Sequence, residues 1–490
     1  MSYPGMRDLK LKEETLFERS RPGRCGYSLP KEELADAGSF IPSEFLRKEL
    51  DLPELSEVDI ARHYTRLSTY NFSIDLGFYP LGSCTMKYNP KINEKMARIP
   101  AFANLHPETP VEYSQGTLKL MYEMQKMLSE IGGFAATTLN PSAGAHGEYV
   151  GLGIIRSYFK KKGDTKRKKI IIPDSAHGTN PASCTLNGFD VVVLESNESG
   201  KVCVDCLKGM LNDEVAGIML TNPNTLGVFE SDIMEITKVV HDAGGLVYGD
   251  GANMNAILGI ARPGDMGIDV LHYNLHKTFS TPHGGGGPGS GPVGVCEKLA
   301  EFLPDPHVVL KDGRYSFANA ASSMGMIRSF YGNMAITLRA YVYILEYGKD
   351  YIADIAKNAV LNANYIKACL KDYYHLKYKS DTLHEVVFDD SEMPNHVTTM
   401  DIAKALIDRG YHPPTVYFPL IVHGAIMIEP TETESKETLD SFIEAMIDIF
   451  ETAKTNPDNI LKAPLNTAIS RPDETIAARK PVLKYCPNAD

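Results

Sequence analysis

The sequence predicts an α/β protein built around a mostly parallel sheet. In the middle of the chain, short β-branched runs alternate with turns and with polar or helical segments, a pattern typical of parallel sheets covered by helices. Just before them, residues 111–133 place apolar side chains at helical spacing and end on two glycines, which indicates a helix and its stop. With 490 residues, the chain also has room for more than one core.

Three regions follow from this pattern, taken in chain order. Residues 1–110 mix helical fragments with irregular stretches such as FYPLGSCTMKYNPKI, so we predict an N-terminal arm. Residues 111–335 form the predicted large α/β domain, whose expected strands are KIIIPD, FDVVVLES, AGIMLTNP, GLVYGDG, DVLHYNL and PVGVCEK. Residues 336–490 form a smaller α+β domain, with a long helix, a strand at LHEVVFDD and a last helix expected to begin near Pro430 and Thr431.

Composition and charge exclude several classes of protein. The net charge of −12 argues against a nucleic-acid partner, because phosphate backbones attract positive surfaces. No stretch of eighteen apolar residues is present to span a bilayer. The first twenty residues lack the apolar core of a secretory signal and carry several acidic side chains, so we expect a cytoplasmic protein.

Two local features have ordinary interpretations. Seven of the ten residues from Lys160 to Lys169 are basic; we interpret them as a solvated turn, and the alternative is a docking site for an acidic partner. Among the eight cysteines, Cys203 and Cys206 form one CxxC pair. A single pair is a weak metal or redox signal, so we expect reduced thiols.

Candidate chemistry lies in the loops that follow the predicted strands, where open α/β sheets bind ligands. NPSAGAHGEY, residues 140–149, is small and glycine-containing and precedes a predicted helix. Its backbone N–H groups and the helix N-terminus are suited to hold a phosphate, although many tight turns look alike for steric reasons.

Asp250 and Lys277 are the two residues that indicate a specific cofactor. Asp250 ends a predicted buried strand, and Lys277 follows the next strand in HYNLHK. Pyridoxal phosphate requires this combination: a carboxylate keeps its pyridine nitrogen protonated, and a lysine amine forms the Schiff base. His177 follows another strand and is placed to stack on the cofactor ring, although a lone loop histidine is often a surface residue.

A pair of histidines and a glycine-rich loop lie close to Lys277 in the sequence. His272 and His276 are four apart, as in helical zinc sites, but on a strand their Cα atoms are roughly 13 Å apart, so we expect no metal. The four glycines of HGGGGPG follow Lys277 closely. Ordering glycines is entropically costly, which favours a close approach of this loop to a ligand or a neighbouring chain.

Together, the motifs YPLGSCTMKYNP, PSAGAHGEY, DSAHGTNPAS, TNPNTLGVFE, GDGANMNA and YNLHKTFSTPHGGGGPG resemble those of the pyridoxal-phosphate-dependent glycine decarboxylases, the P-proteins of the glycine cleavage system. The resemblance runs from about residue 79 to residue 440. Since the chain is about half the length of the single-chain form and contains the lysine, it resembles the second subunit of the split prokaryotic form. The resemblance implies the fold of the fold-type I pyridoxal-phosphate transferases.

The resemblance also implies roles for individual residues. Lys277 would be the Schiff-base lysine, Asp250 the partner of the pyridinium nitrogen and His177 the residue stacked on the ring. The other implied cofactor contacts are Ala143, Gly144, Ala145 and His146 at the phosphate, and Asn222, Thr225 and His276 around the pocket. His146 stands where glutamine is expected in many relatives, so a side-chain role at this position is open.

The implied reaction is decarboxylation of glycine, followed by transfer of the aminomethyl group to the lipoyl arm of a carrier, the H-protein. A homologous subunit 1 without the lysine is the implied partner, in an α2β2 assembly. Two alternatives stay open on the residues alone: another pyridoxal-phosphate enzyme of the same fold, such as an aminotransferase or an amino-acid decarboxylase, and a non-catalytic scaffold subunit.

Overall fold

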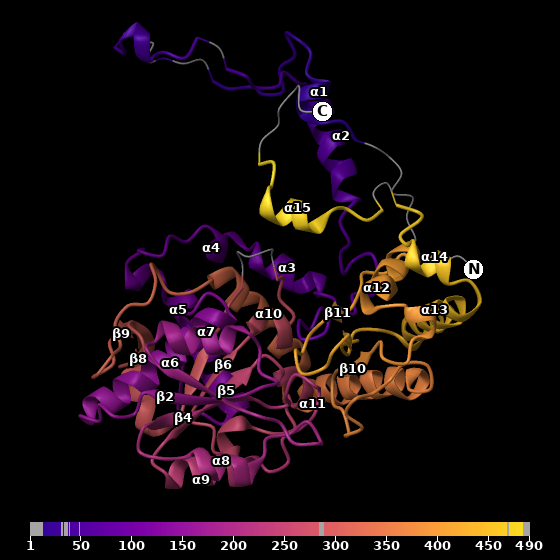
Figure 1. The fold of residues 1–490 in the computed structure, drawn as a ribbon. Coiled ribbons are helices and arrows are strands. Elements are labelled where there is room, and N and C mark those ends of the chain that lie inside the picture. Colours follow the sequence, from indigo (N-terminus) through magenta and orange to yellow (C-terminus); the bar gives the residue numbers. More distant parts are fainter. Residues whose placement is uncertain are drawn as a thin grey trace.

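A computed structural model gives the architecture of the chain (Figure 1). The structure describes residues 13–30, 33, 38, 40–48, 50–283, 289–467 and 470–483. Among them, no helix is both long enough and apolar enough to cross a membrane.

A seven-stranded sheet forms the centre of the larger part of the molecule, with strand order β1-β7-β6-β5-β4-β2-β3. Strand β7 runs antiparallel to both of its neighbours, and the other neighbouring strands are parallel. The strands are β1 (Ala136–Thr138), β2 (Lys169–Pro173), β3 (Asp190–Leu194), β4 (Val215–Thr221), β5 (Leu246–Gly251), β6 (Val270–Tyr273) and β7 (Val293–Val295). The predicted mostly parallel α/β sheet is confirmed, and all six strands expected in this region are present.

Both faces of this sheet are covered by helices, because its strands are apolar on both sides. Ile171, Ile218 and Val247 pack into one hydrophobic cluster, whereas their neighbours Ile170 and Tyr248 pack into another. The first cluster includes side chains of α5 (Gln115–Gly132), α8 (Val204–Met210), α9 (Ile233–Asp242) and α11 (Met334–Leu370), and the second includes α6 (Gly144–Lys161) and α7 (Thr179–Leu186). Helix α5 ends as predicted, with Gly133 in the left-handed conformation at its C-terminus.

The C-terminal part has its own three-stranded antiparallel sheet, in the order β10-β12-β11. Helix α11, which is kinked at Gly348 (φ +56°), joins the two parts: its first half packs in the large core, and its last turns, with Ile366 and Leu370, pack in the small one. The elements are β10 (Val386–Asp389), β11 (Thr415–Val416), β12 (Ala425–Ile428), α12 (Thr399–Asp408), α13 (Lys436–Thr455), α14 (Pro457–Leu461) and α15 (Glu474–Arg479). The domain boundaries near residues 110 and 335 stay a prediction.

The N-terminal segment has two distinct parts. Helices α1 (Leu16–Arg19) and α2 (Glu57–Ser68) stand away from the main body (Figure 1), and α3 (Lys91–Ala97) and α4 (Pro100–Ala103) lie along the large domain. Between them, residues 79–90 run through the interior: Leu81 pairs with Ile428 of the small sheet, and Lys87 is fully buried. This segment therefore touches both cores.

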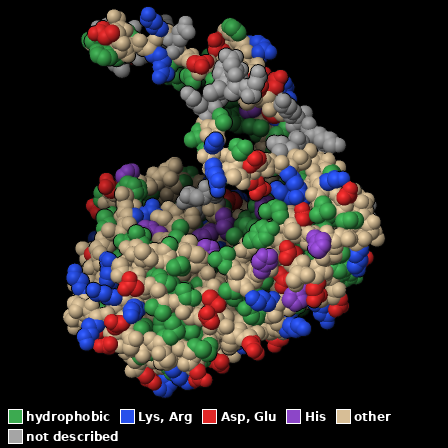
Figure 2. Space-filling model, in the orientation of Figure 1, with side chains coloured by type: hydrophobic (Ala, Val, Ile, Leu, Met, Phe, Trp, Pro, Cys, Tyr) green, Lys and Arg blue, Asp and Glu red, His purple; other side chains and the backbone are tan. Residues whose placement is uncertain are grey.

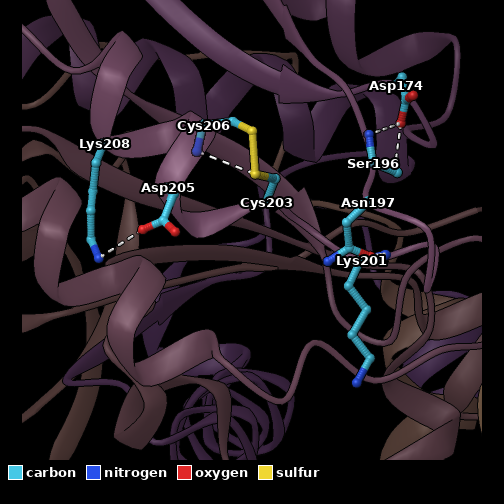
Figure 3. Close-up of a disulfide and its surroundings, with 8 residues drawn as sticks. All are labelled: Asp174, Ser196, Asn197, Lys201, Cys203, Asp205, Cys206 and Lys208. Atoms are coloured by element: carbon cyan, nitrogen blue, oxygen red, sulfur yellow. Dashed lines mark hydrogen bonds and ion pairs between the residues drawn. A yellow bond between two sulfur atoms is a disulfide. The ribbon is translucent and has the colours of Figure 1, made fainter.

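Three local expectations need correction or completion. The last long helix begins at Lys436, not near Pro430, because the hydroxyl of Ser435 caps it by accepting from the N–H of Thr438. Cys203 and Cys206 form a disulfide at the first turn of α8 (Figure 3), not a pair of reduced thiols; their Cα atoms are 5.2 Å apart, within the reach of a bridge. The hairpin of β8 (His307–Lys311) and β9 (Arg314–Ala318) was not expected.

Candidate active site

A cavity of about 250 Å³ opens where the carboxyl ends of β4, β5 and β6 meet the N-terminus of α6. Because these strands are parallel, the loops after them meet at one edge of the sheet. Figure 2 shows histidine side chains gathered at a hollow in the face of the molecule shown there. The cavity is lined by Ser83, Ala143, Gly144, Ala145, Glu148, His177, Thr179, Thr221, Thr225, Asp250, Ala252, Asn253, His272, Asn274, His276 and Lys277.

Lys277 lies in α10 (Leu275–Thr278), a single turn that follows β6 directly. The N-terminal segment holds the backbone around it. Lys87 Nζ donates to the carbonyl of Thr278 at 3.0 Å, and His283 Nε2 lies 2.7 Å from the carbonyl oxygen of Cys84. Ser280, whose hydroxyl donates to the carbonyl of Tyr88 at 2.8 Å, has a φ of +52°. The lysine is therefore presented from a strained and well-supported turn.

Asp250 is the next-to-last residue of β5 and is buried beside several hydrogen-bond donors. Asn180 donates to one carboxylate oxygen at 3.0 Å and the N–H of Ala252 to the other at 2.9 Å, while His272 Nε2 lies 3.3 Å from it. Burial alone would raise the pKa of Asp250, but the charge of His272, the bond from Asn180 and the charge of Lys277 hold that pKa below its usual value. Asp250 is therefore an anion available to a protonated ring nitrogen.

His177 lines the same cavity from the loop after β2. Its Nδ1 lies 2.9 Å from the hydroxyl of Thr179, which in turn donates to Glu148 at 2.7 Å. The same Nδ1 accepts from the backbone N–H of Thr179 at 3.2 Å, and the ring packs edge-on to Phe418, with centroids 5.5 Å apart. These contacts set the orientation of a flat ring at the cavity wall.

The end of the cavity at α6 has the features of a phosphate cradle. Ala143 is the N-cap and gives no side-chain cap, so the first N–H groups of this long helix have no side-chain acceptor at the cap. A Cβ on Gly144 would come within 2.4 Å of Asn274 Oδ1, which leaves room only for glycine. Among the described residues, five buried polar atoms of residues that line the cavity have no hydrogen-bond partner: Glu148 Oε2, Thr221 Oγ1, Asn253 Oδ1, Asn274 Oδ1 and His276 Nδ1.

These features fit pyridoxal phosphate. Backbone donors at a helix N-terminus suit its phosphate, Asp250 suits its pyridine nitrogen and Lys277 suits its aldehyde. The unpartnered polar atoms are groups that a polar ligand would satisfy.

The other predicted residues fall into three groups. Thr225 and His276 line the cavity. The hydroxyl of Thr225 donates to the carbonyl of Ser175. Burial lowers the pKa of His276 to about 3, so its ring is neutral. His146 lies beside the cradle, where Nδ1 accepts from the N–H of Ser142 at 3.1 Å, and it does not line the cavity. Asn222 does not line it either, since Oδ1 accepts from the N–H of Glu230. Residues 284–288 of the glycine-rich loop lie outside the described residues.

For several residues at the site, the sequence pattern predicted no function. Asn180 and Asn274 had no signal beyond their position in loops, and Glu148 had only its place in GAHGEY. Lys87 lies within the motif YPLGSCTMKYNP, but its burial arises only in the tertiary structure. Glu385 and Glu429 are fully buried beside two strands of the small sheet and interact electrostatically with Lys277; a charged residue next to an apolar run, as in LHEVVFDD, was their only signal.

The basic stretch from Lys160 to Lys169 is largely neutralised within the chain. Lys161 pairs with Glu301, Lys166 with Asp213 at 3.0 Å, and Lys169 with Glu214 at 2.5 Å. These pairs are exposed, as expected for a solvated turn. Figure 2 shows acidic and basic side chains interspersed over the face drawn there.

Solved structures show the class to which this fold belongs. The chain matches a glycine decarboxylase (P-protein) of the glycine cleavage system with a TM-score of 0.70 at 21% identity, over 84% of this chain and 94% of that one. It matches a Burkholderia pseudomallei sphingosine-1-phosphate lyase with a TM-score of 0.62 at 12% identity, over 87% and 96% of the chains. The fold is that of the fold-type I pyridoxal-phosphate-dependent enzymes, as the sequence predicted.

Sequence comparisons then give the family. The family model described as glycine cleavage system P-protein matches residues 30–312, and the one described as glycine dehydrogenase, C-terminal domain, matches residues 355–469. A probable glycine dehydrogenase (decarboxylating) subunit 2 from Caldanaerobacter subterraneus subsp. tengcongensis is 57% identical over 97% of this chain and 99% of its own length. One from Alkaliphilus oremlandii is 58% identical over 96% and 98%. The chain belongs to the glycine cleavage system P-protein family.

Proposed function

We propose that this chain decarboxylates glycine with pyridoxal phosphate and passes the aminomethyl group to the lipoyl arm of an H-protein, with release of carbon dioxide. The observation that carries the proposal is the convergence of Lys277, Asp250 and the N-terminus of α6 on one cavity, in a chain of this family. The reaction needs all three groups in one place.

The residues of the chain have distinct tasks in this reaction. The first turn of α6 binds the phosphate, and Asp250 keeps the ring nitrogen protonated. Bound pyridoxal phosphate supplies an electron sink for the electrons of the bond that releases carbon dioxide. Lys277 would hold the cofactor at its aldehyde, and the lysine amine would carry protons at the reacting end of the cavity. His177, oriented by Thr179, covers the ring face.

The relatives are named as subunit 2 of glycine dehydrogenase, and this name indicates that a first subunit exists as a partner. We propose a homologous first subunit without the lysine as partner, in an α2β2 tetramer, and a lipoylated H-protein as acceptor. The cytoplasmic location inferred from the sequence stays a prediction.

Two measurements test the function. The purified chain is incubated with pyridoxal phosphate, reduced with borohydride and digested, and the modified peptide is identified by mass spectrometry. We expect a pyridoxyl group on Lys277. The exchange of labelled bicarbonate into glycine, measured with the partner subunit and H-protein, is expected to depend on Lys277 and to vanish in Lys277→Ala.

Each result has a defined meaning. An adduct that forms only after the partner is added would show that the site is completed at the subunit interface. An adduct without bicarbonate exchange would favour an aminotransferase or another decarboxylase of this fold. Absence of the adduct under both conditions would leave the scaffold alternative.

A further inference from the structure

Two glutamates stand opposite each other at the edge of the small sheet. Val386 of β10 pairs with Ile428 of β12, and this antiparallel register places Glu385 across from Glu429 one step further. Opposite side chains in such a pair share one face of the sheet and are close neighbours. One carboxylate oxygen of each lies within 4.8 Å of the other and of a ring nitrogen of His384.

The segment that crosses the small sheet holds both carboxylates. The N–H of Ser83 donates to Glu385 Oε2 and the N–H of Thr85 donates to Glu429 Oε2, both at 2.9 Å. Ser83 and Thr85 have φ values of +62° and +51°, which are unusual for residues with a side chain. Among the described residues, the second oxygen of each glutamate has no hydrogen-bond partner.

Among the described residues, Lys87 and Lys277 supply positive charge near the pair. Glu385, Glu429 and His384 are all fully buried. Burial lowers the pKa of His384 to about 3, so that its ring is neutral, and burial raises the pKa of the Cys84 thiol. Lys87 is already paired with Glu432 at 2.8 Å.

Among the described residues, Lys277 is the cation whose charge acts on both glutamates, whereas Lys87 acts on Glu429. The charge of Lys277 interacts with groups on the N-terminal segment, both sheets and its own loop, namely Cys84, Asp250, His276, His283, His384, Glu385 and Glu429. Two carboxylates this close and fully buried do not both stay ionised, because each repels the other's charge. With one proton between them, the pair carries a single negative charge.

We propose that Glu385 and Glu429 share one proton and act as a single counter-ion of Lys277, in addition to Asp250. The proposal rests on the proposed function in one respect, since it takes Lys277 as the reactive amine. The pair keeps one negative charge near Lys277 while the amine of Lys277 gives up and regains a proton in the cavity. Both glutamates act through Lys277 and are positioning residues.

The test measures the titration of Lys277 in the full chain without cofactor. An amine-selective reagent labels the chain across a pH series, and mass spectrometry of the Lys277 peptide gives the apparent pKa of its amine. The variants are Glu385→Gln, Glu429→Gln and the double variant. The matched control is Glu434→Gln, because burial alone raises the pKa of this partly buried carboxyl, with no contribution from Lys277.

A shared proton predicts a non-additive result. In either single variant the remaining glutamate ionises, so the net charge is unchanged and the pKa of Lys277 stays within a few tenths of a unit. In the double variant the charge is gone, and the pKa of Lys277 falls by about one unit, a tenfold increase in neutral amine at a given pH. A fall of similar size in each single variant would mean two independent carboxylates, and an unchanged double variant would mean no counter-ion; both results overturn the proposal.

A second measurement covers the case in which the double variant does not fold. Infrared difference spectra between the wild type and each single variant are expected to show the loss of one protonated carboxyl band, because the remaining glutamate is ionised. Loss of an ionised carboxylate band in either spectrum overturns the proposal. The borohydride adduct is scored separately, so a missing adduct with the expected titration contradicts only the proposed function.

Discussion

The ammonium group of Lys87 lies 3.0 Å from the carbonyl oxygen of Thr278, the residue that follows Lys277. The same ammonium group donates to Asn255 and Glu432, both at 2.8 Å, and its side chain is 1% exposed. One buried lysine thus ties the N-terminal segment to the lysine turn of the large domain and to the small domain. The geometry of the candidate active site depends on a residue that lies outside the cavity.

Replacement of Lys87 by methionine is expected to destabilise the chain by about 3–5 kcal/mol, because Glu432 is left buried without its partner. Urea unfolding measures this loss. The control is Lys91→Met, which removes the exposed pair with Asp75, 60% and 53% exposed, and is expected to cost about 0–1 kcal/mol. Equal losses in the two variants would contradict a structural role for Lys87.

Replacement of Asp250 by asparagine is expected to leave the pyridoxyl adduct on Lys277 in place and to lower bicarbonate exchange by roughly a hundredfold or more, since the charge opposite the ring nitrogen is lost. Asp269→Asn is the control. Asp269 is also buried, with His241 and Lys298 as partners at 2.6 and 2.7 Å, and it lies outside the cavity. That variant is expected to lose stability and keep the exchange rate per folded molecule.

Replacement of Gly144 by alanine is expected to weaken binding of pyridoxal phosphate about tenfold or more, equivalent to at least about 1.4 kcal/mol. The added Cβ would come within 2.4 Å of Asn274 Oδ1 and displace the cradle. An absorbance titration measures the affinity. Gly116→Ala in α5, where no atom lies within 4 Å of the added Cβ, should keep the affinity and raise stability by up to about 1 kcal/mol.

Glu434 predicts a specific dependence of stability on pH. Burial raises its pKa from 4.5 to about 7, so the folded chain binds this proton more tightly than the unfolded one. The contribution of the protonated Glu434 side chain to the free energy of unfolding is fully present below pH 4.5 and is lost as the pH rises towards 7. Glu434→Gln should therefore gain stability relative to the wild type over this interval, by roughly 1–2 kcal/mol. Urea unfolding at several pH values measures the difference, and a gain that is the same at every pH would contradict this assignment.

The sheet was predictable because its strands are strongly apolar and bounded by turns. KIIIPD and GLVYGDG became β2 and β5, and Asp250 and Lys277 reached one cavity because parallel strands end at the same edge. Strand β1 escaped prediction because three residues, ATT, carry no periodicity. The start of α13 was misplaced because several capping residues occur in sequence, and local pattern alone does not choose among them.

By itself, the sequence determined the fold class and the cofactor, and it predicted central residues for the site, because these depend on local patterns and on motifs that follow strands. The tertiary structure alone decided which further groups surround Lys277. Lys87 is 191 residues from Thr278 in the chain, and Ser83 is 302 residues from Glu385. Burial of these charges, and with it their altered pKa values, arises only when three distant segments pack together and exclude water.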